Sequence, residues 1–363
     1  MRQFKNILVT GGCGFIGVNF IRYLFGKADG FCGRVINLDA LTYAGNRASL
    51  NDIEAEYGSA LPDESRRYFF EQGDICDRSF AESLFRKYEI DTVAHFAAES
   101  HVDRSILGPE AFIKTNVMGT FTLLEASRDA WKDGNGHLFH YVSTDEVFGS
   151  LGDSGYFTEA TPYDPRSPYS ASKASSDHLV MAYHHTYSLP VTLSNCSNNY
   201  GPYQFPEKLI PLMILNMLEK KPLPVYGDGK NIRDWLYVED HNSAVWIIMQ
   251  NGREGDKYNI GGENEWENIK LLHALIDIVA QKAGLSSAAI RNTIAYVKDR
   301  PGHDRRYAID CSKIKKELGW KQKASFEEGL EQTVDWYLAN TEWVENIRSG
   351  DYRSWIEKNY GKR

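Results

Sequence analysis

Cysteine is scarce in this 363-residue chain, and its cysteines show no paired pattern. The five residues are Cys13, Cys32, Cys76, Cys196 and Cys311, with no Cys-x-x-Cys pair and none of the spacing of a structural zinc site. We therefore expect no metal centre. The absence of a paired framework also favours a reducing, cytoplasmic setting.

Long apolar runs and basic runs are also missing. The amino-terminal residues enter Ile7–Val9 directly, and this run is too short for a signal peptide or a membrane span. The 41 Lys and Arg residues against 49 Asp and Glu residues give a net charge of -8, and no basic run is long enough for a nucleic-acid surface. We expect neither a membrane nor a nucleic-acid partner. Because the net charge repels anions, a phosphate-bearing ligand must be held by a local cluster of Arg, Lys and backbone N–H groups.

The first half of the chain alternates short apolar runs with longer amphipathic stretches. The apolar runs lack strict alternation, which is typical of strands covered on both faces. Six strands are predicted, at Ile7–Val9, Arg34–Asp39, Tyr68–Gln72, Thr92–Phe96, Leu138–Ser143 and Val191–Ser194. The repetition predicts an α/β fold with a doubly wound parallel sheet, which is a Rossmann-like arrangement.

The character of the sequence changes after about Asn195, where prolines become frequent. We predict an NAD-binding domain over residues 1–195 and a smaller C-terminal region for substrate binding over residues 196–363. Tyr258–Ile260 again has the pattern of a strand followed by a glycine turn. A segment near 235–262 is therefore expected to return to the sheet, so that the two regions interleave.

A glycine-rich loop follows the first predicted strand and precedes the helix-like stretch Val18–Phe25. In such a turn one glycine allows the bend, one lets a pyrophosphate reach backbone N–H groups at the helix N-terminus, and one permits close packing. Gly11, Gly14 and Gly17 fit these three roles. The loop predicts a dinucleotide site, and the alternative is a tight turn that binds no ligand.

Asp39 ends the second predicted strand, about twenty residues beyond the glycine loop. Its carboxylate can accept hydrogen bonds from ribose hydroxyls and would repel a 2′-phosphate, which favours NAD over NADP. The alternative is that Asp39 only caps the turn that follows it. Further cofactor contacts are expected at the carboxyl ends of later strands, at Asp74, Ile75, Phe96, Ala97 and Ala98.

Tyr169 and Lys173 are four residues apart in a helix-like stretch, and therefore on one helical face. A tyrosine hydroxyl is a poor base at neutral pH, but a nearby Lys⁺ stabilises the phenolate and lowers its pKa. Tyr169 could then deprotonate a substrate hydroxyl while a hydride leaves for NAD. The alternative is an ordinary helix surface.

Thr144, Asp145 and Glu146 follow the fifth predicted strand, at the carboxyl edge of the sheet. If Thr144 bonds the hydroxyl being oxidised, the two carboxyl groups supply an acid and a base. Simple oxidation needs no such pair, whereas elimination of water does. The alternative is a solvated loop with two ordinary acids.

Over nearly its whole length the chain resembles the dTDP-glucose 4,6-dehydratases of the extended short-chain dehydrogenase/reductase family. The stretches that carry the resemblance are the glycine loop, Asp39–Asn46 (DALTYAGN), Ala97–Ser105 (AAESHVDRS), Ser143–Gly149 (STDEVFG), Tyr169–Lys173, Asn195–Tyr203 (NCSNNYGPY), Asn231–His241 (NIRDWLYVEDH) and Asp299–Asp310 (DRPGHDRRYAID).

The resemblance implies a role for several groups of residues. Catalysis would fall to Thr144, Asp145, Glu146, Tyr169 and Lys173. The nucleotide-sugar would contact Glu99, Thr144, Asn198, Lys208, Leu209, Pro224, Val225, Tyr226, Arg233, Asn268, Arg300 and His303. The cofactor would also contact Phe15, Ile16, Ala40, Leu41, Thr42, Ser100, Thr115, Tyr169, Lys173 and Asn199.

The basic residues in that set have simpler alternatives. Arg233 and Arg300 are suited to clamp a pyrophosphate. Without the resemblance, Arg233 could form a surface ion pair with Asp234, and Arg300 and His303 could belong to a plain turn in which the histidine is structural.

The implied reaction is the NAD-dependent dehydration of a nucleotide-diphosphate hexose, dTDP-glucose above others, to a 4-keto-6-deoxy sugar. Oxidation at C4 would be followed by elimination across C5 and C6 and by return of the hydride to C6. The alternatives are a 4-epimerase, a uronate decarboxylase or a UDP-sugar 4,6-dehydratase on the same fold, and a non-catalytic NAD-sensing module. The resemblance also implies a homodimer.

Overall fold

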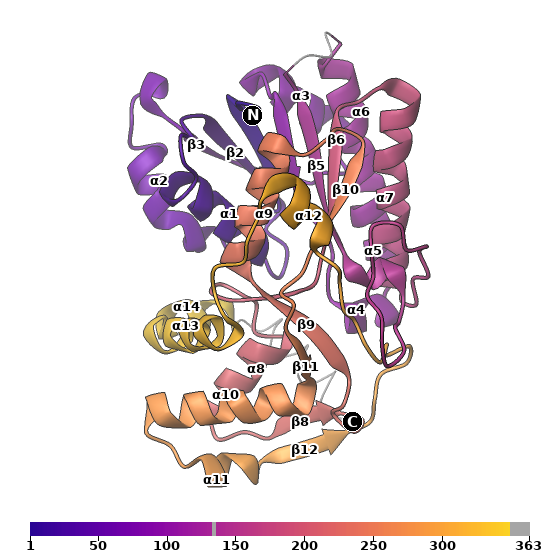
Figure 1. The fold of residues 1–363 in the computed structure, drawn as a ribbon. Coiled ribbons are helices and arrows are strands. Elements are labelled where there is room, and N and C mark those ends of the chain that lie inside the picture. The colour runs from indigo at the N-terminus through magenta and orange to yellow at the C-terminus, as the bar shows by residue number, and fades with distance from the viewer. Residues whose placement is uncertain (133–135, 349–363) are drawn as a thin grey trace.

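The computed structural model describes residues 1–132 and 136–348. Residues 349–363 of the predicted second region lie outside the described residues. At the centre is a seven-stranded sheet in the order β10-β6-β5-β4-β1-β2-β3, in which every neighbouring pair is parallel (Figure 1). Its strands are β1 (Asn6–Thr10), β2 (Arg34–Asp39), β3 (Tyr68–Gln72), β4 (Thr92–His95), β5 (Leu138–Thr144), β6 (Val191–Cys196) and β10 (Asp256–Ile260).

The six strands predicted from apolar runs are all present, and the prediction of a doubly wound α/β fold is confirmed. Strands β4, β5 and β6 are buried along their whole length, which explains why their sequences are continuously apolar and do not alternate. The observed strands differ from the predicted strands at their ends. β4 stops at His95, before Phe96, and β5 and β6 each continue past the predicted end, to Thr144 and Cys196.

Helices cover both faces of the sheet. Alternate residues of β1 show this, because Leu8 packs in one hydrophobic cluster while Ile7 and Val9 pack in another. The Leu8 face is covered by α3 (Arg78–Tyr88), α6 (Thr120–Ala130) and α7 (Pro168–Tyr187), and the opposite face by α1 (Phe15–Gly26), α9 (Val238–Asn251) and α12 (Ser312–Leu318). Shorter helices are α2 (Asn51–Tyr57), α4 (Val102–Leu107) and α5 (Glu110–Phe112), and a π-helical turn, Ile113–Gly119, leads into α6.

The start of α7 is fixed by its own sequence. The Ser167 side chain accepts a hydrogen bond from the Ser170 backbone N–H, the Ser170 hydroxyl bonds back to Ser167, and Pro168 occupies the first helical position. Tyr169 therefore lies in the first turn of α7, next to the carboxyl end of the sheet. Lys173 follows one turn later on the same face.

A second group of elements lies below the carboxyl ends of the sheet strands in Figure 1. Its strands are β7 (Asn198–Tyr200), β9 (Ile232–Tyr237) and β11 (Glu265–Glu267) in one small sheet, and β8 (Leu223–Tyr226) and β12 (Ile294–Val297) in another. Its helices are α8 (Leu209–Leu218), α10 (Asn268–Ala283), α11 (Ser287–Arg291), α13 (Phe326–Ala339) and α14 (Thr341–Ile347). Trp235 and Tyr237 are buried in the core of this group.

The chain passes more than once between the two groups. After β9 it returns through α9 and β10, and β10 pairs in parallel with β6 at the edge of the large sheet. The strand predicted at Tyr258–Ile260 therefore does rejoin the sheet. After β12 the chain crosses back again to α12 before it continues into α13 and α14 (Figure 1).

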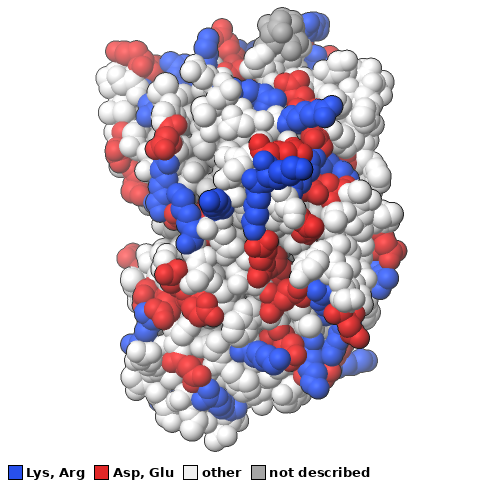
Figure 2. All heavy atoms as spheres, in the orientation of Figure 1, with Lys and Arg blue, Asp and Glu red and all other residues white. Residues whose placement is uncertain are grey.

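The surface carries both signs of charge. On the face shown in Figure 2, lysines and arginines are interspersed with aspartates and glutamates over both groups of elements. Among the described residues, none of the helices combines the length and the apolar character that crossing a bilayer demands.

Candidate active site

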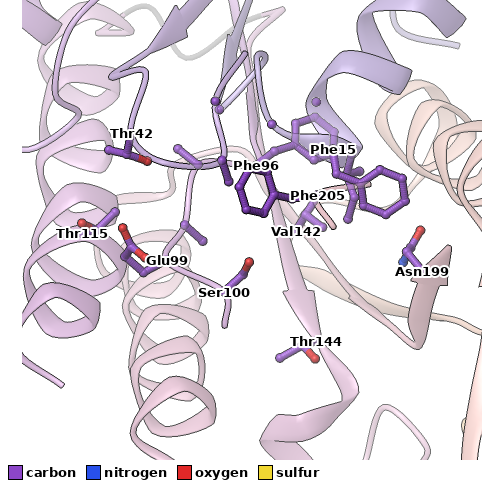
Figure 3. Close-up of a pocket in the computed structure, with 18 of the residues that line it drawn as sticks. Phe15, Thr42, Phe96, Glu99, Ser100, Thr115, Val142, Thr144, Asn199 and Phe205 are labelled. Carbon is purple, nitrogen blue, oxygen red and sulfur yellow. The ribbon is translucent and has the colours of Figure 1, made fainter. Parts of the chain in front are cut away.

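A cavity of about 350 Å³ opens at the carboxyl ends of the sheet strands, where the two groups of elements meet. Most of the predicted cofactor residues line it, together with all five predicted catalytic residues. Figure 3 shows Thr42, Glu99 and Thr115 on one side of this space and Asn199 on the other. The predicted residues that line the cavity are Gly11, Gly14, Phe15, Ile16, Gly17, Asp39, Ala40, Thr42, Asp74, Ile75, Phe96, Ala97, Ala98, Glu99, Ser100, Thr115, Thr144, Asp145, Glu146, Tyr169, Lys173, Asn198, Asn199 and Lys208.

The glycine loop has the geometry of a phosphate-binding turn. Gly11 has φ +69°, and a Cβ there would lie 2.7 Å from the backbone of Ala97. A Cβ on Gly17 would lie 2.2 Å from the Gly11 carbonyl oxygen. Helix α1 begins at Phe15, and no side chain caps it, so its first N–H groups point toward the cavity. These features fit a dinucleotide pyrophosphate.

Asp39 is buried at the end of β2 and holds two loops together. Its Oδ2 accepts a hydrogen bond from the Cys13 N–H and its Oδ1 accepts one from the Leu41 N–H, both at 2.8 Å. Burial raises the pKa of Asp39, and these two backbone bonds oppose the rise. The capping role named as the alternative is therefore present. Asp39 also lines the cavity, and carboxylate oxygens have lone pairs left for further donors.

Thr144, Asp145 and Glu146 form the turn directly after β5. The Thr144 hydroxyl donates to Asp145 Oδ1 at 3.3 Å and accepts from the Glu146 N–H at 3.3 Å. Asp145 is 1% exposed, so it does not belong to a solvated loop. The alternative of two ordinary acids in a solvated loop is wrong for Asp145, and Glu146 is half-buried and lines the cavity.

The two adjacent carboxyl groups have different electrostatic surroundings. Burial raises the pKa of Asp145 well above its usual value, and the neighbouring Glu146 and Asp234 raise it further. Burial also raises the pKa of Glu146, but Arg300, Arg233 and Lys208 act to lower it. Arg233 also opposes the rise at Asp145, but Asp145 is the carboxyl group whose pKa is raised well above its usual value, so the surroundings favour Asp145 as the acid and Glu146 as the base.

Tyr169 and Lys173 both reach the cavity from α7. Burial raises the pKa of Tyr169 well above its usual value, and the Thr144 hydroxyl opposes this rise, so the lowered pKa expected from the spacing of Tyr169 and Lys173 is not found. Burial lowers the pKa of Lys173 to about 8. The Lys173 ammonium donates to the Val142 carbonyl oxygen at 2.7 Å and lies 4.2 Å from the centre of the Tyr141 ring. Both residues are buried, which excludes the alternative of an ordinary helix surface.

A cluster of basic residues faces the acidic pair from the second group of elements. Arg233 is 5% exposed, donates to the carbonyl oxygens of Ile232 and Asp304, and lies 4.1 Å from the centre of the Tyr307 ring. It does not pair with Asp234, whose carboxylate accepts from the N–H groups of Gly262 and Asn264. The alternative of a surface ion pair is therefore wrong.

His303 and Arg300 lie beside this cluster. His303 Nδ1 is 2.6 Å from Asp299 Oδ1, and its ring centre is 6.1 Å from that of Tyr226. Burial lowers the pKa of His303 to about 4, and Arg300 and Arg233 lower it as well. His303 is thus a neutral histidine at neutral pH, next to the two arginines.

Nine predicted residues lie away from the cavity walls. They are Leu41, Leu209, Pro224, Val225, Tyr226, Arg233, Asn268, Arg300 and His303. Leu41 lies in the loop after β2, and the others lie at the start of α8, in β8 and β9, at the start of α10 and in the segment after β12. The elements that carry the eight residues other than Leu41 extend from the acidic pair into the second group of elements. These eight residues could therefore contact only a ligand that is longer than the cavity.

Several cavity residues were not predicted from the sequence. They are Leu38, Tyr43, Ala44, Gly45, Gly73, Val142, Ser143, Cys196, Ser197, Gln204, Phe205 and Glu207. Glu207 is the most unexpected, since it is a buried carboxylate that accepts from Arg104 Nε at 3.1 Å. Its position next to Lys208 was the one available signal. For Cys196 the signal was its place at the end of β6, the strand next to β5, where Cys196 pairs with Thr144.

Comparisons with known proteins agree on one group. The family model described as GDP-mannose 4,6 dehydratase matches residues 8–333. A dTDP-glucose 4,6-dehydratase of Salmonella typhimurium is 53% identical over 371 residues, which covers 98% of this chain and 99% of the relative.

Solved structures give the same result. The dTDP-glucose 4,6-dehydratase DesIV from Streptomyces venezuelae, solved with NAD bound, has a TM-score of 0.84 and 46% identity over 94% of this chain and 99% of its own. A UDP-glucose 4-epimerase of Thermus thermophilus, also solved with NAD, is less similar. Its TM-score is 0.78 and its identity 28%, over 92% of this chain and 99% of its own.

Proposed function

Because the chain belongs to the family of dTDP-glucose 4,6-dehydratases, we infer that it is an NAD-dependent hydro-lyase that removes water from dTDP-glucose. The product is dTDP-4-keto-6-deoxyglucose. The nucleotide-sugar is the substrate and NAD the cofactor, as in the Streptomyces relative that was solved with NAD.

The adjacent pair Asp145 and Glu146 is the observation that carries this function. A 4-epimerase on the same fold also oxidises C4, but it has no use for an acid and a base at C5 and C6. Here the buried Asp145 and the half-buried Glu146 line the same cavity as Thr144, Tyr169 and Lys173, and the pKa of Asp145 is the one raised well above its usual value. Water elimination needs this combination.

We assign the steps to side chains as follows. Tyr169 takes the proton from the C4 hydroxyl, helped by the positive charge of Lys173 and by the Thr144 hydroxyl. NAD, when bound, would supply the hydride acceptor for C4 and the hydride donor for C6. The 4-ketone acidifies the C5 hydrogen, so Glu146 can remove it as a proton while Asp145 protonates the departing C6 hydroxyl, which leaves as water. Once C6 has received the hydride, Glu146 returns a proton to C5, and Tyr169 and Asp145 regain their starting states by proton exchange with solvent.

The remaining predicted residues are assigned by their places around the cavity. The glycine loop and Asp39 would hold the pyrophosphate and ribose of NAD. Arg233 and Arg300 would hold the diphosphate of the sugar nucleotide. The buried Arg233 and the half-buried Arg300 supply the local positive potential that a phosphate-bearing ligand requires in a protein of negative net charge.

Isotope labelling tests the dehydration directly. In heavy water the product should gain one solvent deuteron at C5, and deuterium placed on C4 of the substrate should appear at C6 without exchange. Glu146→Gln should suppress elimination but permit C4 oxidation, so reduced-cofactor absorbance should build up. Mass spectrometry and NMR of the product check both points. A C4 epimer that keeps its C6 hydroxyl, or loss of the C4 label to solvent, would contradict the mechanism.

We also propose that the chain forms a homodimer and works in the cytoplasm. Three large apolar residues are exposed on elements that follow one another in the chain, namely Leu107 of α4 and Ile113 and Met118 of the π-helical turn, with exposed fractions of 57%, 48% and 49%. A second copy of the chain could cover them. All five cysteines are free thiols, which fits a reducing compartment.

A further inference from the structure

A buried carboxylate with no assigned step lies one helical turn after Lys173. Asp177 is 1% exposed and stands on the same face of α7 as Lys173, four residues later. Its Oδ2 accepts hydrogen bonds from the Tyr163 hydroxyl at 2.7 Å and from the Asn195 amide at 3.2 Å. Burial raises the pKa of Asp177, and these donors, together with the Ser143 hydroxyl and Lys173, act to lower it. Several donors on one carboxylate favour its ionised form.

Asp177 and Lys173 both connect to the end of β5, which leads into the acidic pair. The Asn195 amide that bonds Asp177 also donates to the Thr144 carbonyl oxygen at 3.1 Å. The Lys173 ammonium donates to the Val142 carbonyl oxygen at 2.7 Å. Lys173 is therefore bonded directly to position 142 of this strand, and Asp177 is linked to position 144 through the Asn195 amide.

Asp145 and Glu146 line the same cavity as Lys173 but are not among the groups that shift its pKa, and the other titratable groups around the pair supply no second negative charge. They are His95 of β4, Tyr141 of β5, Cys196 of β6, Lys257 of β10, Tyr163 before α7 and Tyr169 on α7. Burial lowers the pKa of the histidine and raises the pKa of the cysteine and of the three tyrosines, so these groups are neutral near pH 7. Asp177 is thus the anion that faces Lys173 from within the protein.

We propose that Asp177 is a positioning residue that acts as the counter-charge of Lys173 and keeps it protonated while the substrate is oxidised. This inference rests on the proposed function, in which the Lys173 ammonium favours the phenolate of Tyr169. Asp177 itself contacts neither substrate nor cofactor in this role.

The direction of the pH effect follows from the charges. Burial lowers the pKa of Lys173 to about 8, and Asp177 raises it. An opposite charge nearby shifts a pKa by about 1–3 units. Without Asp177, the pKa of Lys173 would therefore be lower, and Lys173 would lose its proton at a lower pH. Because the protonated form is the active one, activity is present below the pKa of Lys173 and lost as the pH rises through it.

The pH profile of dehydration tests the proposal. Asp177→Asn, which removes the charge but keeps the shape, should move the alkaline limb of kcat to lower pH by about one unit or more. Asp177→Glu keeps the negative charge and should return the alkaline limb of kcat to its original pH, even where kcat itself is lower. Tyr163→Phe removes a hydrogen bond from the same carboxylate without removing its charge, and should leave the limb in place. Superimposable profiles for Asp177→Asn and the unmodified protein would overturn the proposal, as would an equal shift in Tyr163→Phe.

A double-mutant cycle gives a second measurement that needs no activity. Asp177→Asn should lower the melting temperature when Lys173 is present, because it leaves a buried cation without its partner. In a Lys173→Met background the same change should raise the melting temperature, because it removes a lone buried anion. Equal changes in melting temperature in both backgrounds would contradict the pairing of Asp177 with Lys173. If Asp177→Asn does not fold alone, recovery of folding in the double variant supports the pairing and failure to recover opposes it.

The two proposals can fail separately. If the unmodified protein forms no keto-sugar from dTDP-glucose, the proposed function fails, while the melting temperatures still measure the coupling between Lys173 and Asp177. If the keto-sugar forms but neither the alkaline limb nor the coupling responds, the dehydratase assignment stands and the counter-charge is wrong.

Discussion

At the scale of single residues, the chemistry of the site depends on neighbouring side chains whose pKa values are shifted by different surroundings. Asp145 and Glu146 are adjacent in the sequence, yet the positive groups Arg300, Arg233 and Lys208 act on Glu146 while Asp234 adds negative charge near Asp145. Two carboxyl groups with the same intrinsic chemistry can therefore take opposite roles.

Asp39 carries a prediction about cofactor choice. Its carboxylate lines the cavity and also accepts the N–H groups of Cys13 and Leu41, so its removal would loosen both loops. Asp39→Asn keeps an acceptor oxygen for the loops but loses the charge that repels a 2′-phosphate. We expect the unmodified protein to bind NAD much more tightly than NADP, and Asp39→Asn to narrow that gap.

Titration of each variant with both dinucleotides measures the effect. Asp39→Ala serves as the comparison. It should narrow the difference in affinity between NAD and NADP, and it should also weaken the binding of both cofactors. Equal affinity of the unmodified protein for NAD and NADP would exclude this role for Asp39.

At the scale of elements, the last described helix holds a loop of the cofactor cavity. Trp343 of α14 donates from Nε1 to the Ser49 hydroxyl at 2.8 Å, and its ring centre lies 5.7 Å from that of Tyr203. Ile347 of α14 is buried with Phe205, against Tyr43 and Ala44. Tyr43, Ala44 and Phe205 line the cavity, so α14 packs on the outer side of its wall.

We predict that Trp343→Ala weakens NAD binding and lowers stability by roughly 1–3 kcal/mol, the usual cost of removing a packed side chain that is partly buried. Trp343→Phe is the matched control, since it loses the hydrogen bond to Ser49 but keeps a ring against Tyr203. It should lie between the alanine variant and the unmodified protein. Denaturant unfolding and the NAD content of the purified protein measure the two effects. Unchanged NAD binding in the alanine variant would show that α14 does not support the cavity wall.

At the scale of the whole molecule, two hydrophobic cores meet across the cavity. One core packs under α1 and α9 against the sheet, and the other is built from β9, α8, α10 and α13. The chain crosses between them through β9, α9 and β10 and again before α12, so neither group is a simple half of the sequence. This interleaving fixes the acidic pair against the basic cluster.

The exposed apolar face predicts an oligomer. Met118→Glu places a charge on this face, and a buried charge in an interface costs several kcal/mol, so we expect the variant to be monomeric in light scattering after gel filtration. Tyr296→Glu is the control, because Tyr296 is 61% exposed on β12 of the other group and should leave assembly unchanged. A monomeric unmodified protein, or a dimeric Met118→Glu variant, would contradict the proposed homodimer.

The sequence by itself determined the local features of this protein. Continuous apolar runs predicted the parallel strands because a strand buried on both faces has no polar side. The glycine loop, the Asp145–Glu146 pair and the Tyr169–Lys173 spacing could be recognised because each depends on residues close together in the chain. Their common location also followed, since the carboxyl ends of parallel strands meet at one edge of the sheet.

Only the tertiary structure decided which distant residues complete the site. Glu207 and Phe205 enter the cavity, Arg233 bonds to the Asp304 carbonyl rather than to Asp234, and Asp177 receives Tyr163 and Asn195. These contacts join segments that no periodicity relates, and their burial sets the pKa values on which the chemistry depends. The sequence could name the acids and bases, but the packing of separate elements around them decided which carboxyl group has its pKa raised well above the usual value, because desolvation and the nearest opposite charge are properties of the folded chain.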